Sequence, residues 1–231
     1  MRNFYIDGVP SSTYGIYISG TGVWNAPERD VEVIEIPGRN GTLTLDNGRY
    51  KNIEVRYPAI FVNGFQSNIE GARAWLCKSP GYRRLEDDHD LTHYRLARYV
   101  SGLELNVATM LDAAKTTLRF DCMPQRFLKS GETEVTVTTD ITNPTLFDAL
   151  PKITVTGSSA GSLTINGNTV TISEIGTSVV LDCEIQRAYH GTTPRDNSIS
   201  GSFPVLVPGV NTISYSGGVT SVKIVPRWWT L

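Results

Sequence analysis

The sequence predicts a mainly β protein with two domains, of which the first is α+β with one main helix and the second is all β. Three observations support this prediction: short alternating apolar segments recur along all 231 residues, one segment alone has a helical period, and no helical pattern follows residue 151. The chain exceeds the usual domain length of about 100–150 residues. We therefore place two domains at 1–139 and 140–231.

The first domain is expected to open with a hairpin, because Asp7-Gly8 favours positive φ and separates the strand-like segments "NFYI" and "YGIYIS". The strand "VEVIEI" (31–36) follows, and Asn47-Gly48 is expected to join "TLTLD" to "RYKNIEVRY" in a second hairpin. Pro58 cannot donate to a strand ladder and predicts a sheet edge or a bulge. Alternation at period two predicts one buried face in the second hairpin. Its members are Leu43, Leu45, Ile53, Val55 and Tyr57.

One segment reads as a helix, "SNIEGARAWLCK" at 67–78. Ser67 and Glu70 have the spacing of a capping box, in which each side chain bonds the backbone N–H of the other residue. Ser79-Pro80-Gly81 predicts the end of the helix. A single apolar face is expected to hold this helix against the sheet. It consists of Ile69, Ala72, Trp75 and Leu76.

The other predicted strands are short. In the first domain they are "HYRLARYV", "LELNVA", "TTLRFDC" and "TEVTVTT". In the second domain, strand-like segments recur at intervals of about 8–12 residues with turn residues between them, as in a small antiparallel sandwich. These segments are "KITVT", "GSLTI", "NTVTIS", "SVVLDC", "FPVLV", "NTISYS" and "VTSVKIV".

Composition argues against several classes of protein. Twenty-one basic and twenty-three acidic side chains give a net charge of −2, whereas sequence-specific nucleic-acid binding needs a basic excess on one face. Cys77, Cys122 and Cys183 are odd in number and widely spaced, so we expect free thiols rather than a disulfide framework or structural zinc. No apolar run approaches the roughly 18 residues of a membrane span, so no membrane insertion is expected.

The segment "LEDDHDLTH" (85–93) is rich in possible metal ligands or acid–base groups. His89 and His93 would share a helical face, but the residues after them have strand character, so the spacing loses that meaning. The spacing of a calcium loop, with its glycine and its glutamate at position twelve, is missing. We therefore expect a charged turn that leads into a strand, with no metal and no cofactor.

The sequence contains none of the common catalytic motifs, such as G-x-S-x-G, a phosphate-binding P-loop, H-E-x-x-H or G-x-G-x-x-G. A Cys-His pair is arithmetically possible, but no local sequence indicates an activated nucleophile. We therefore expect that the protein is not an enzyme.

Two regions are candidates for binding. The loop "PGRNG" (37–41) can turn sharply and present Arg39 and Asn40 outward, either as a solvated tip or as an inter-subunit contact. Nearby Asp46 and Arg49 are further candidates for inter-subunit contacts. In the second domain, Tyr215, Trp228 and Trp229 are candidates for docking or sugar contacts, since lectin sandwiches stack sugars on exposed rings. The alternative is that the two tryptophans close the open end of the sandwich or contact a neighbouring subunit.

The chain resembles the distal tail protein (Dit) family of siphophages over nearly its whole length. Five segments, in order, carry the resemblance: "VIEIPGRNGTLTL", "RYKNIEVRYPAIF", "IEGARAWLCKSPGYRRLEDDHDLTHYRLARY", "LRFDCMPQRF" and "NPTLFDALPKITVTGSSAGSLTINGNTVTI". The resemblance implies a first domain like a tail-tube split barrel, which builds a ring, and a galectin-like C-terminal sandwich. Neither a long arm nor an inserted sugar-binding module fits the roughly 80 residues after Pro151, a length suited to a bare sandwich.

What the resemblance implies about function is a structural virion protein of the phage tail tip. A homo-hexameric ring would cap the tail tube and serve as the baseplate hub for host adsorption. Its partners would be other copies of itself, the tail tube protein, a tail-tip or tail-associated protein, and receptor-binding or other baseplate proteins. Such a protein would be assembled in the host cytoplasm. The alternative function is a glycan-binding module that contacts host cell-wall saccharide through the C-terminal sandwich.

Overall fold

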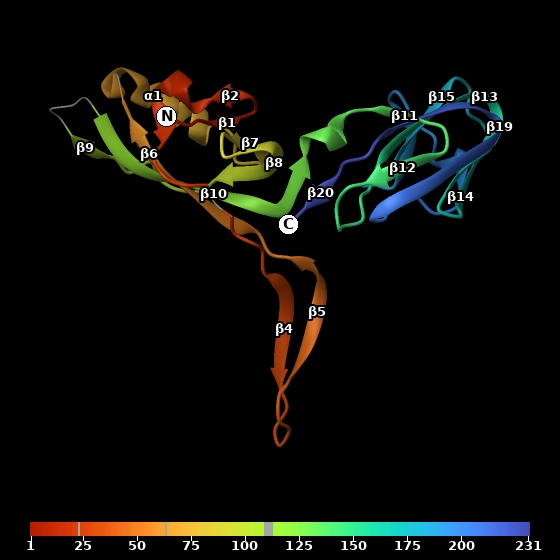
Figure 1. The fold of residues 1–231 in the computed structure, drawn as a ribbon, viewed down its shortest axis with the longest axis horizontal. Helices are drawn as coiled ribbons and strands as arrows, with labels where there is room; N and C mark the ends of the chain where they lie inside the picture. Colours follow the sequence, from red (N-terminus) through yellow and green to blue (C-terminus); the bar gives the residue numbers. More distant parts are fainter. Residues whose placement is uncertain (23, 63, 109–112) are drawn as a thin grey trace. The chain divides into compact units, whose positions relative to one another are not determined.

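The computed structural model describes residues 1–231 except 23, 63 and 109–112. Two compact units divide the chain: residues 1–126 together with Leu231, and residues 127–230 (Figure 1). Both units are built mainly of β-strands, as predicted, and one α-helix lies in the first. Each unit is described by itself.

The first unit contains a curved antiparallel sheet, whose strand order is β2-β1-β7-β8-β10-β6-β3, with β9 paired to β10. A separate two-stranded ribbon is formed by β4 and β5 (Figure 1). The strands are β1 (Phe4–Ile6), β2 (Val9–Pro10), β3 (Ile16–Ile18), β4 (Arg29–Glu35), β5 (Thr42–Tyr50), β6 (Ile53–Phe61), β7 (Arg83–Asp87), β8 (Asp90–Tyr99), β9 (Asn106–Ala108) and β10 (Ala113–Leu128).

The predicted reversal at Asp7-Gly8 is confirmed, because both residues have positive φ (51° and 80°). The hairpin joins β1 to β2, however, and the second expected strand, β3, pairs with β6 instead. A 3₁₀ turn, η1 (Ser11–Tyr14), lies between β2 and β3 and carries the chain to the other edge of the sheet. The partner of β3 is therefore set by long-range pairing, which a turn signal does not report.

The predicted hairpin across Asn47-Gly48 is wrong. β5 runs without a break from Thr42 to Tyr50, although Gly48 has a φ of 72°. Its partner is β4, to which it is joined through the loop at 37–41, while β6 lies between β10 and β3. The expected buried face is accordingly split: Ile53, Val55 and Tyr57 are buried in β6, but Leu43 and Leu45 are exposed on the ribbon.

The core of the first unit lies under β6 and β10, whose alternate residues point inward. Pro58 interrupts no ladder in this sheet. Its carbonyl accepts a hydrogen bond from Ser19 N (2.8 Å), so its nitrogen faces the same side, where β3 has already ended. Pro58 therefore lies inside β6, opposite Thr117 of β10 and next to the end of β3, and not on an edge strand or at a bulge as predicted. The inward residues of β6 are Ile53, Val55, Tyr57, Ala59 and Phe61.

The predicted helix is confirmed as α1 (Phe65–Cys77), but its start differs. The N-cap is Gly64, in a left-handed conformation, and Ser67 lies inside the first turn, where its Oγ donates to the Gly64 carbonyl (2.8 Å). The capping box between Ser67 and Glu70 is therefore wrong. The predicted apolar face is right, because Ala72, Trp75 and Leu76 are buried in the core and Ile69 packs against it.

The second unit is a nine-stranded antiparallel sheet around its own core. The order β11-β19-β13-β15-β16-β17 is extended by β12 on β19, by β14 on β13 and by β18 on β14. Two short 3₁₀ turns, η3 (Lys129–Glu132) and η4 (Asp196–Ser198), connect strands. The strands are β11 (Val135–Val137), β12 (Asp140–Asn143), β13 (Lys152–Ile165), β14 (Asn168–Ile172), β15 (Ser178–Asp182), β16 (Arg187–His190), β17 (Thr193–Pro194), β18 (Ile199–Ser200) and β19 (Gly209–Val225); the closing strand β20 (Trp229–Thr230) pairs with β10.

Four of the predicted short strands of the second unit are arms of two long ones. β13 contains "KITVT" and "GSLTI", and β19 contains "NTISYS" and "VTSVKIV". Register shifts between Thr156 and Gly161 separate the arms, so that one arm of β13 pairs with β15 and the other with β14. Ile153 from the first arm and Leu163 from the second are fully buried in the same core, as the two layers of a sandwich require.

The division between the units falls before β11, whereas we expected it after residue 139. β11 pairs with β19, with Val137 opposite Val222, and Val137 is buried in the second core. Gly131 lies directly against Trp228, where an added Cβ would come within 2.4 Å of the Trp228 nitrogen. The segment after β10 is thus part of the second unit.

Candidate assembly surfaces and the polar turn

The β4–β5 ribbon is amphipathic. Its register places Ile34 opposite Leu43 and Glu32 opposite Leu45, and paired residues of an antiparallel ladder share one face. Alternation adds Ile36 to the same face, while Val33 and Thr44 lie on the other. One side of the ribbon is therefore mostly apolar and the other is mixed.

The apolar face of the ribbon is exposed. Its four large side chains, which we call the ribbon face, have between 36% and 46% of their surface accessible. They are Ile34, Ile36, Leu43 and Leu45. An isolated two-stranded hairpin is marginal in water, and soluble monomers rarely leave several large apolar side chains together on one exposed strand pair. The ribbon face is therefore a candidate surface for contact with another chain.

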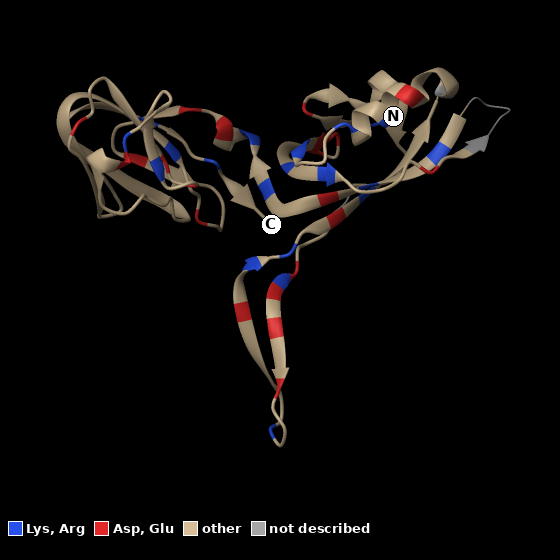
Figure 2. Cartoon of the chain, turned by 180° about the vertical axis from the view of Figure 1, so that it is seen from behind, with Lys and Arg blue, Asp and Glu red and all other residues tan. Residues whose placement is uncertain are grey.

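Ion pairs hold the base of the ribbon, and both strands carry acidic and basic residues (Figure 2). Arg29 donates two hydrogen bonds to one Asp46 oxygen and one to the other, at 2.7–3.0 Å, and its guanidinium lies 4.7 Å from the centre of the Tyr50 ring. The hydrogen bond from Arg29, with one from the Gly48 N–H, holds the pKa of Asp46 below its usual range. Arg49 pairs with Asp30 at 2.7 Å.

The four residues predicted as inter-subunit contacts differ in their surroundings: two are ion-paired within the ribbon and two are exposed at its tip. Asp46 and Arg49 are already paired within the ribbon, where they support its geometry. Arg39 and Asn40 are exposed at the tip between Gly38 and Gly41, whose φ angles are 80° and 82°. A contact of any of the four with a neighbouring subunit stays a prediction. Sequence reasoning missed the ribbon face, although the alternation in "VEVIEI" and "TLTLD" was the signal for it.

The segment "LEDDHDLTH" forms the predicted charged turn between β7 and β8. Its carboxylates are bonded to the chain rather than solvated. Asp87 accepts hydrogen bonds from Tyr57 Oη (2.5 Å) and from the N–H groups of His89 (2.8 Å) and Asp90 (3.1 Å). Asp88 accepts from Asn3 N (2.7 Å) and Tyr5 Oη (2.9 Å). The turn thus ties β7 and β8 to β1 and β6.

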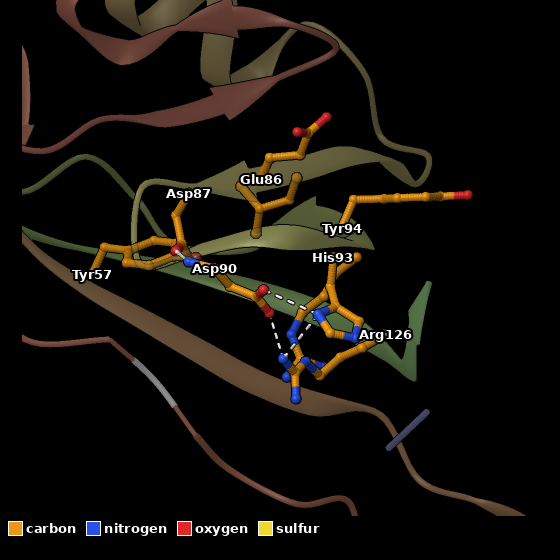
Figure 3. A pocket seen from close by; sticks show the side chains of 9 residues that line it. Tyr57, Glu86, Asp87, Asp90, His93, Tyr94 and Arg126 are labelled. Atoms are coloured by element: carbon orange, nitrogen blue, oxygen red, sulfur yellow. Dashed lines mark hydrogen bonds and ion pairs between the residues drawn. The ribbon is translucent and has the colours of Figure 1, made fainter. Parts of the chain in front are cut away.

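A small polar pocket lies beside this turn (Figure 3). Burial alone would raise the pKa of Asp90, but hydrogen bonds with His93, Arg126 and Thr92 outweigh it and hold the pKa below its usual range. Burial lowers the pKa of Arg95, whose Nη1 is enclosed without a protein partner. The cavity is about 30 Å³, enough for a water molecule, whereas ligand pockets measure roughly 300 Å³ or more. The pocket has no room for a substrate.

Two of the three cysteines, Cys122 and Cys183, are in environments that oppose nucleophilic chemistry. Burial raises the pKa of both Cys122 and Cys183 to about 12, and Cys77 is exposed on α1. An activated thiol has a depressed pKa instead. In the part of the chain that the structure describes, three or more His, Cys, Asp or Glu side chains nowhere gather as a metal site would require, and no helix has the length and apolar character to cross a bilayer.

The aromatic candidates of the second unit are mostly engaged within it. Trp228 is 5% exposed and belongs to the core, so its ring is not accessible for the predicted docking or sugar contact. Trp229 is half-buried, stacks on Phe147 with ring centres 4.5 Å apart, and donates its indole N–H to the Asp148 carbonyl (2.9 Å). Tyr215 on β19 packs against the core and is partly exposed. The two tryptophans thus stabilise their own unit.

Comparison with known proteins gives a likeness of fold. No protein-family model matches the chain, and no curated protein sequence matches it significantly. Among solved structures, the Dit protein of phage SPP1, described as a paradigm of the hub adsorption apparatus in phages that infect Gram-positive hosts, is similar with a TM-score of 0.77 and 15% identity over 100% of both chains. A chain from the activated, strontium-containing baseplate of phage p2 is similar with a TM-score of 0.51 and 7% identity over 97% of both chains. The resemblance seen in the sequence is confirmed at this level: from end to end, the chain has the fold of the SPP1 Dit protein.

Proposed function

We propose that the chain is a structural protein of a phage tail tip and that copies of it form a ring, a hexamer, which caps the tail tube as the hub of the adsorption apparatus. The observation that carries the proposal is the match to SPP1 Dit over 100% of both chains. A match of this extent covers both units and their connection in sequence, rather than one common β motif. Similarity to a baseplate chain of phage p2 supports the same setting.

The ribbon face supplies a physical reason for assembly. Four apolar side chains are exposed on one side of the two-stranded ribbon. Covering them with a second chain stabilises the contact by about 25 cal/mol per Å² of apolar surface buried. A contact that is repeated by rotation between identical copies closes into a ring when the rotation divides the circle. The outer edges of β4 and β5 also offer backbone groups for strand addition by a neighbour. We therefore assign the ribbon to contacts between subunits.

The proposed role requires no reaction by this chain. The pocket beside the polar turn has room for about one water molecule, and burial holds the Cys122 and Cys183 thiols protonated. In a tail tip, the partners of the ring would be the tail tube protein, a tail-tip protein and receptor-binding or other baseplate proteins, after assembly in the host cytoplasm. The alternative of glycan binding through the second unit gains no support, because Trp228 is buried and Trp229 is stacked within that unit.

Labelling of phage particles tests the proposal. Particles assembled with a copy of the chain that carries a C-terminal peptide tag are decorated with gold-conjugated antibody and viewed by negative-stain microscopy. The expected result is gold at the end of the tail distal to the capsid. Gold on the capsid or along the tail shaft, or particles that lack the chain, would contradict the proposal.

A further inference from the structure

The second unit carries a group of exposed apolar side chains on two neighbouring segments, which we call the end patch. It consists of Leu146, Leu150, Val207 and Val210. Ala149 and Leu206 pair through two backbone hydrogen bonds of 3.0 Å, and both point into the core. Their chain neighbours Leu150 and Val207 therefore point outward. Leu146, in the same loop, is 87% exposed.

Val210 joins this surface through β12. It is paired with Thr142, while the next residues on each strand, Asn143 and Asn211, are buried. Asn143 donates to the carbonyls of Phe147 (2.9 Å) and Leu206 (3.1 Å), which fastens β12 to both segments of the end patch. The four side chains thus stand on segments that are joined to one another by hydrogen bonds.

Side-chain hydrogen bonds brace the backbone of these segments. Asn211 exchanges hydrogen bonds with the backbone of Val207, from Val207 N to Oδ1 and from Nδ2 to the Val207 carbonyl, each 2.8 Å. Thr145 donates to Asn143 Oδ1 through both its N–H (2.9 Å) and its hydroxyl (2.8 Å). Prolines further restrict the backbone at 144, 151, 204 and 208. An apolar surface that is already ordered loses little conformational entropy on binding, which favours a docking role.

The two segments that carry the end patch hold charge of one sign. Residues 139–151 and 201–212 contain Asp140 and Asp148 but no lysine or arginine. Two copies that met symmetrically through this patch would bring acidic groups against acidic groups, so a symmetric self-contact is disfavoured. A partner with lysine or arginine beside its apolar side chains would complement the patch. The edge of β12 that faces away from β19 offers backbone groups to such a segment, since β12 pairs only with β19 among the described strands.

We propose that the end patch is a docking surface for an extended polypeptide segment of a second protein, whose apolar side chains cover Leu146 and Val210 and whose basic residues meet Asp140 and Asp148. The proposal rests on the proposed function for naming that second protein as a tail component. The contact between the two polypeptides is argued from the patch itself.

A designed peptide pair tests this surface. The probe is a fluorescein-labelled peptide of about nine residues that alternates valine and leucine with lysine, and its counterpart has glutamate at each lysine position. Fluorescence anisotropy is measured with the full-length chain. We expect saturable binding of the lysine peptide, binding weaker by roughly tenfold or more in L146S/V210S, and weaker binding of the glutamate peptide. Leu91→Ser is the matched control, because Leu91 is equally prominent on β8 of the first unit.

Two further readouts keep the outcome specific. Thermal unfolding of L146S/V210S should match that of the wild type, because both side chains are exposed. Hydrogen exchange should show protection by the lysine peptide at β12 and at 206–210. Absence of lysine-peptide binding, equal binding of the two peptides, or equal binding by wild type and L146S/V210S would overturn the proposal. Loss of self-association in L146S/V210S would also overturn the proposal, because it would assign the end patch to contact with a second copy of the chain. Tail-tip localisation and ring formation are measured in separate experiments, so failure of this proposal and failure of the proposed function can be told apart.

Discussion

Substitution of the ribbon face should weaken self-association without unfolding the protein. Leu43 and Leu45 are 41% and 46% exposed, so somewhat less than half of each side chain remains to be covered. Full burial of a leucine contributes about 1.5–3 kcal/mol, which leaves about 0.7–1.3 kcal/mol per leucine for an intermolecular contact. The pair in L43T/L45T therefore removes about 1.5–2.5 kcal/mol from each contact, or roughly a 10- to 60-fold loss in its association constant.

The assay is light scattering coupled to gel filtration over a range of protein concentrations. Threonine keeps the strand propensity of both positions, and neither leucine belongs to the core of the first unit, so thermal unfolding should shift little. Val33→Thr is the matched control, because Val33 is 57% exposed on the opposite face of the same ribbon. It should associate as the wild type does.

Three results would refute this reasoning. If L43T/L45T assembled at the same concentrations as the wild type, the ribbon face would not be the contact between copies. If V33T lost assembly to the same extent, the effect would come from the ribbon as a whole rather than from its apolar side. A wild type that stayed monomeric at every concentration would remove the contact altogether.

Three further predictions concern stability and reactivity. Gly131→Ala should lower the free energy of unfolding of the second unit by about 1–3 kcal/mol in urea titration, because the added Cβ would lie 2.4 Å from Trp228 N. Gly102→Ala is the control, since its Cβ would meet nothing within 4 Å and should change the stability little. Equal stability of the two variants would contradict the close packing at Gly131. Iodoacetamide at pH 8 should modify Cys77 alone in the native protein, because Cys77 is exposed and burial raises the pKa of Cys122 and Cys183 to about 12. Fast labelling of either buried thiol, measured by mass spectrometry, would contradict this prediction. Arg227 donates hydrogen bonds to Asp182 (2.7 and 3.0 Å) and lowers the pKa of Asp182, so the pair stabilises the fold fully above the unfolded pKa of about 3.9 and loses this effect as pH falls through the folded pKa. D182N should therefore be less stable than the wild type at pH 6 and should lose less stability between pH 4 and pH 2. If the free energy of unfolding of the two proteins fell in parallel over that range, the pair would not contribute in this way.

Much of the secondary structure follows from local sequence. The apolar face of α1 was predictable because a helical period reports burial directly, and Ala72, Trp75 and Leu76 are indeed in the core. The helix start was not predictable from Ser67 and Glu70, because Gly64 provides a left-handed N-cap one turn earlier. Capping residues are short-range signals that compete with one another, so the boundary is less certain than the helix itself.

Strand pairing was less accessible to sequence reasoning. Asn47-Gly48 has the composition of a hairpin turn, yet it lies within β5, because the loop at 37–41 already provides the reversal that pairs β5 with β4. The ion pair between Arg29 and Asp46 depends on the register shift between Arg29 and Val31, which no periodicity reveals. Both features depend on which distant segment a strand meets, and local patterns do not encode that choice.

The candidate sites show the same division. Trp228 is buried and Trp229 is half-buried, because consecutive residues near a strand point to opposite sides. Which of the two would be buried followed from the approach of Gly131, which is distant in sequence. The end patch was invisible in the sequence for a similar reason, since Ala149 and Leu206 must pair before their neighbours are known to face outward.

The central claim is that identical copies of this chain associate into a ring. Negative-stain microscopy of the purified wild-type protein, with two-dimensional class averages, measures this directly. The account predicts closed rings with six-fold symmetry that are lost in L43T/L45T and retained in V33T. Particles of single-chain size at every concentration, or rings that persist unchanged in L43T/L45T, would contradict it.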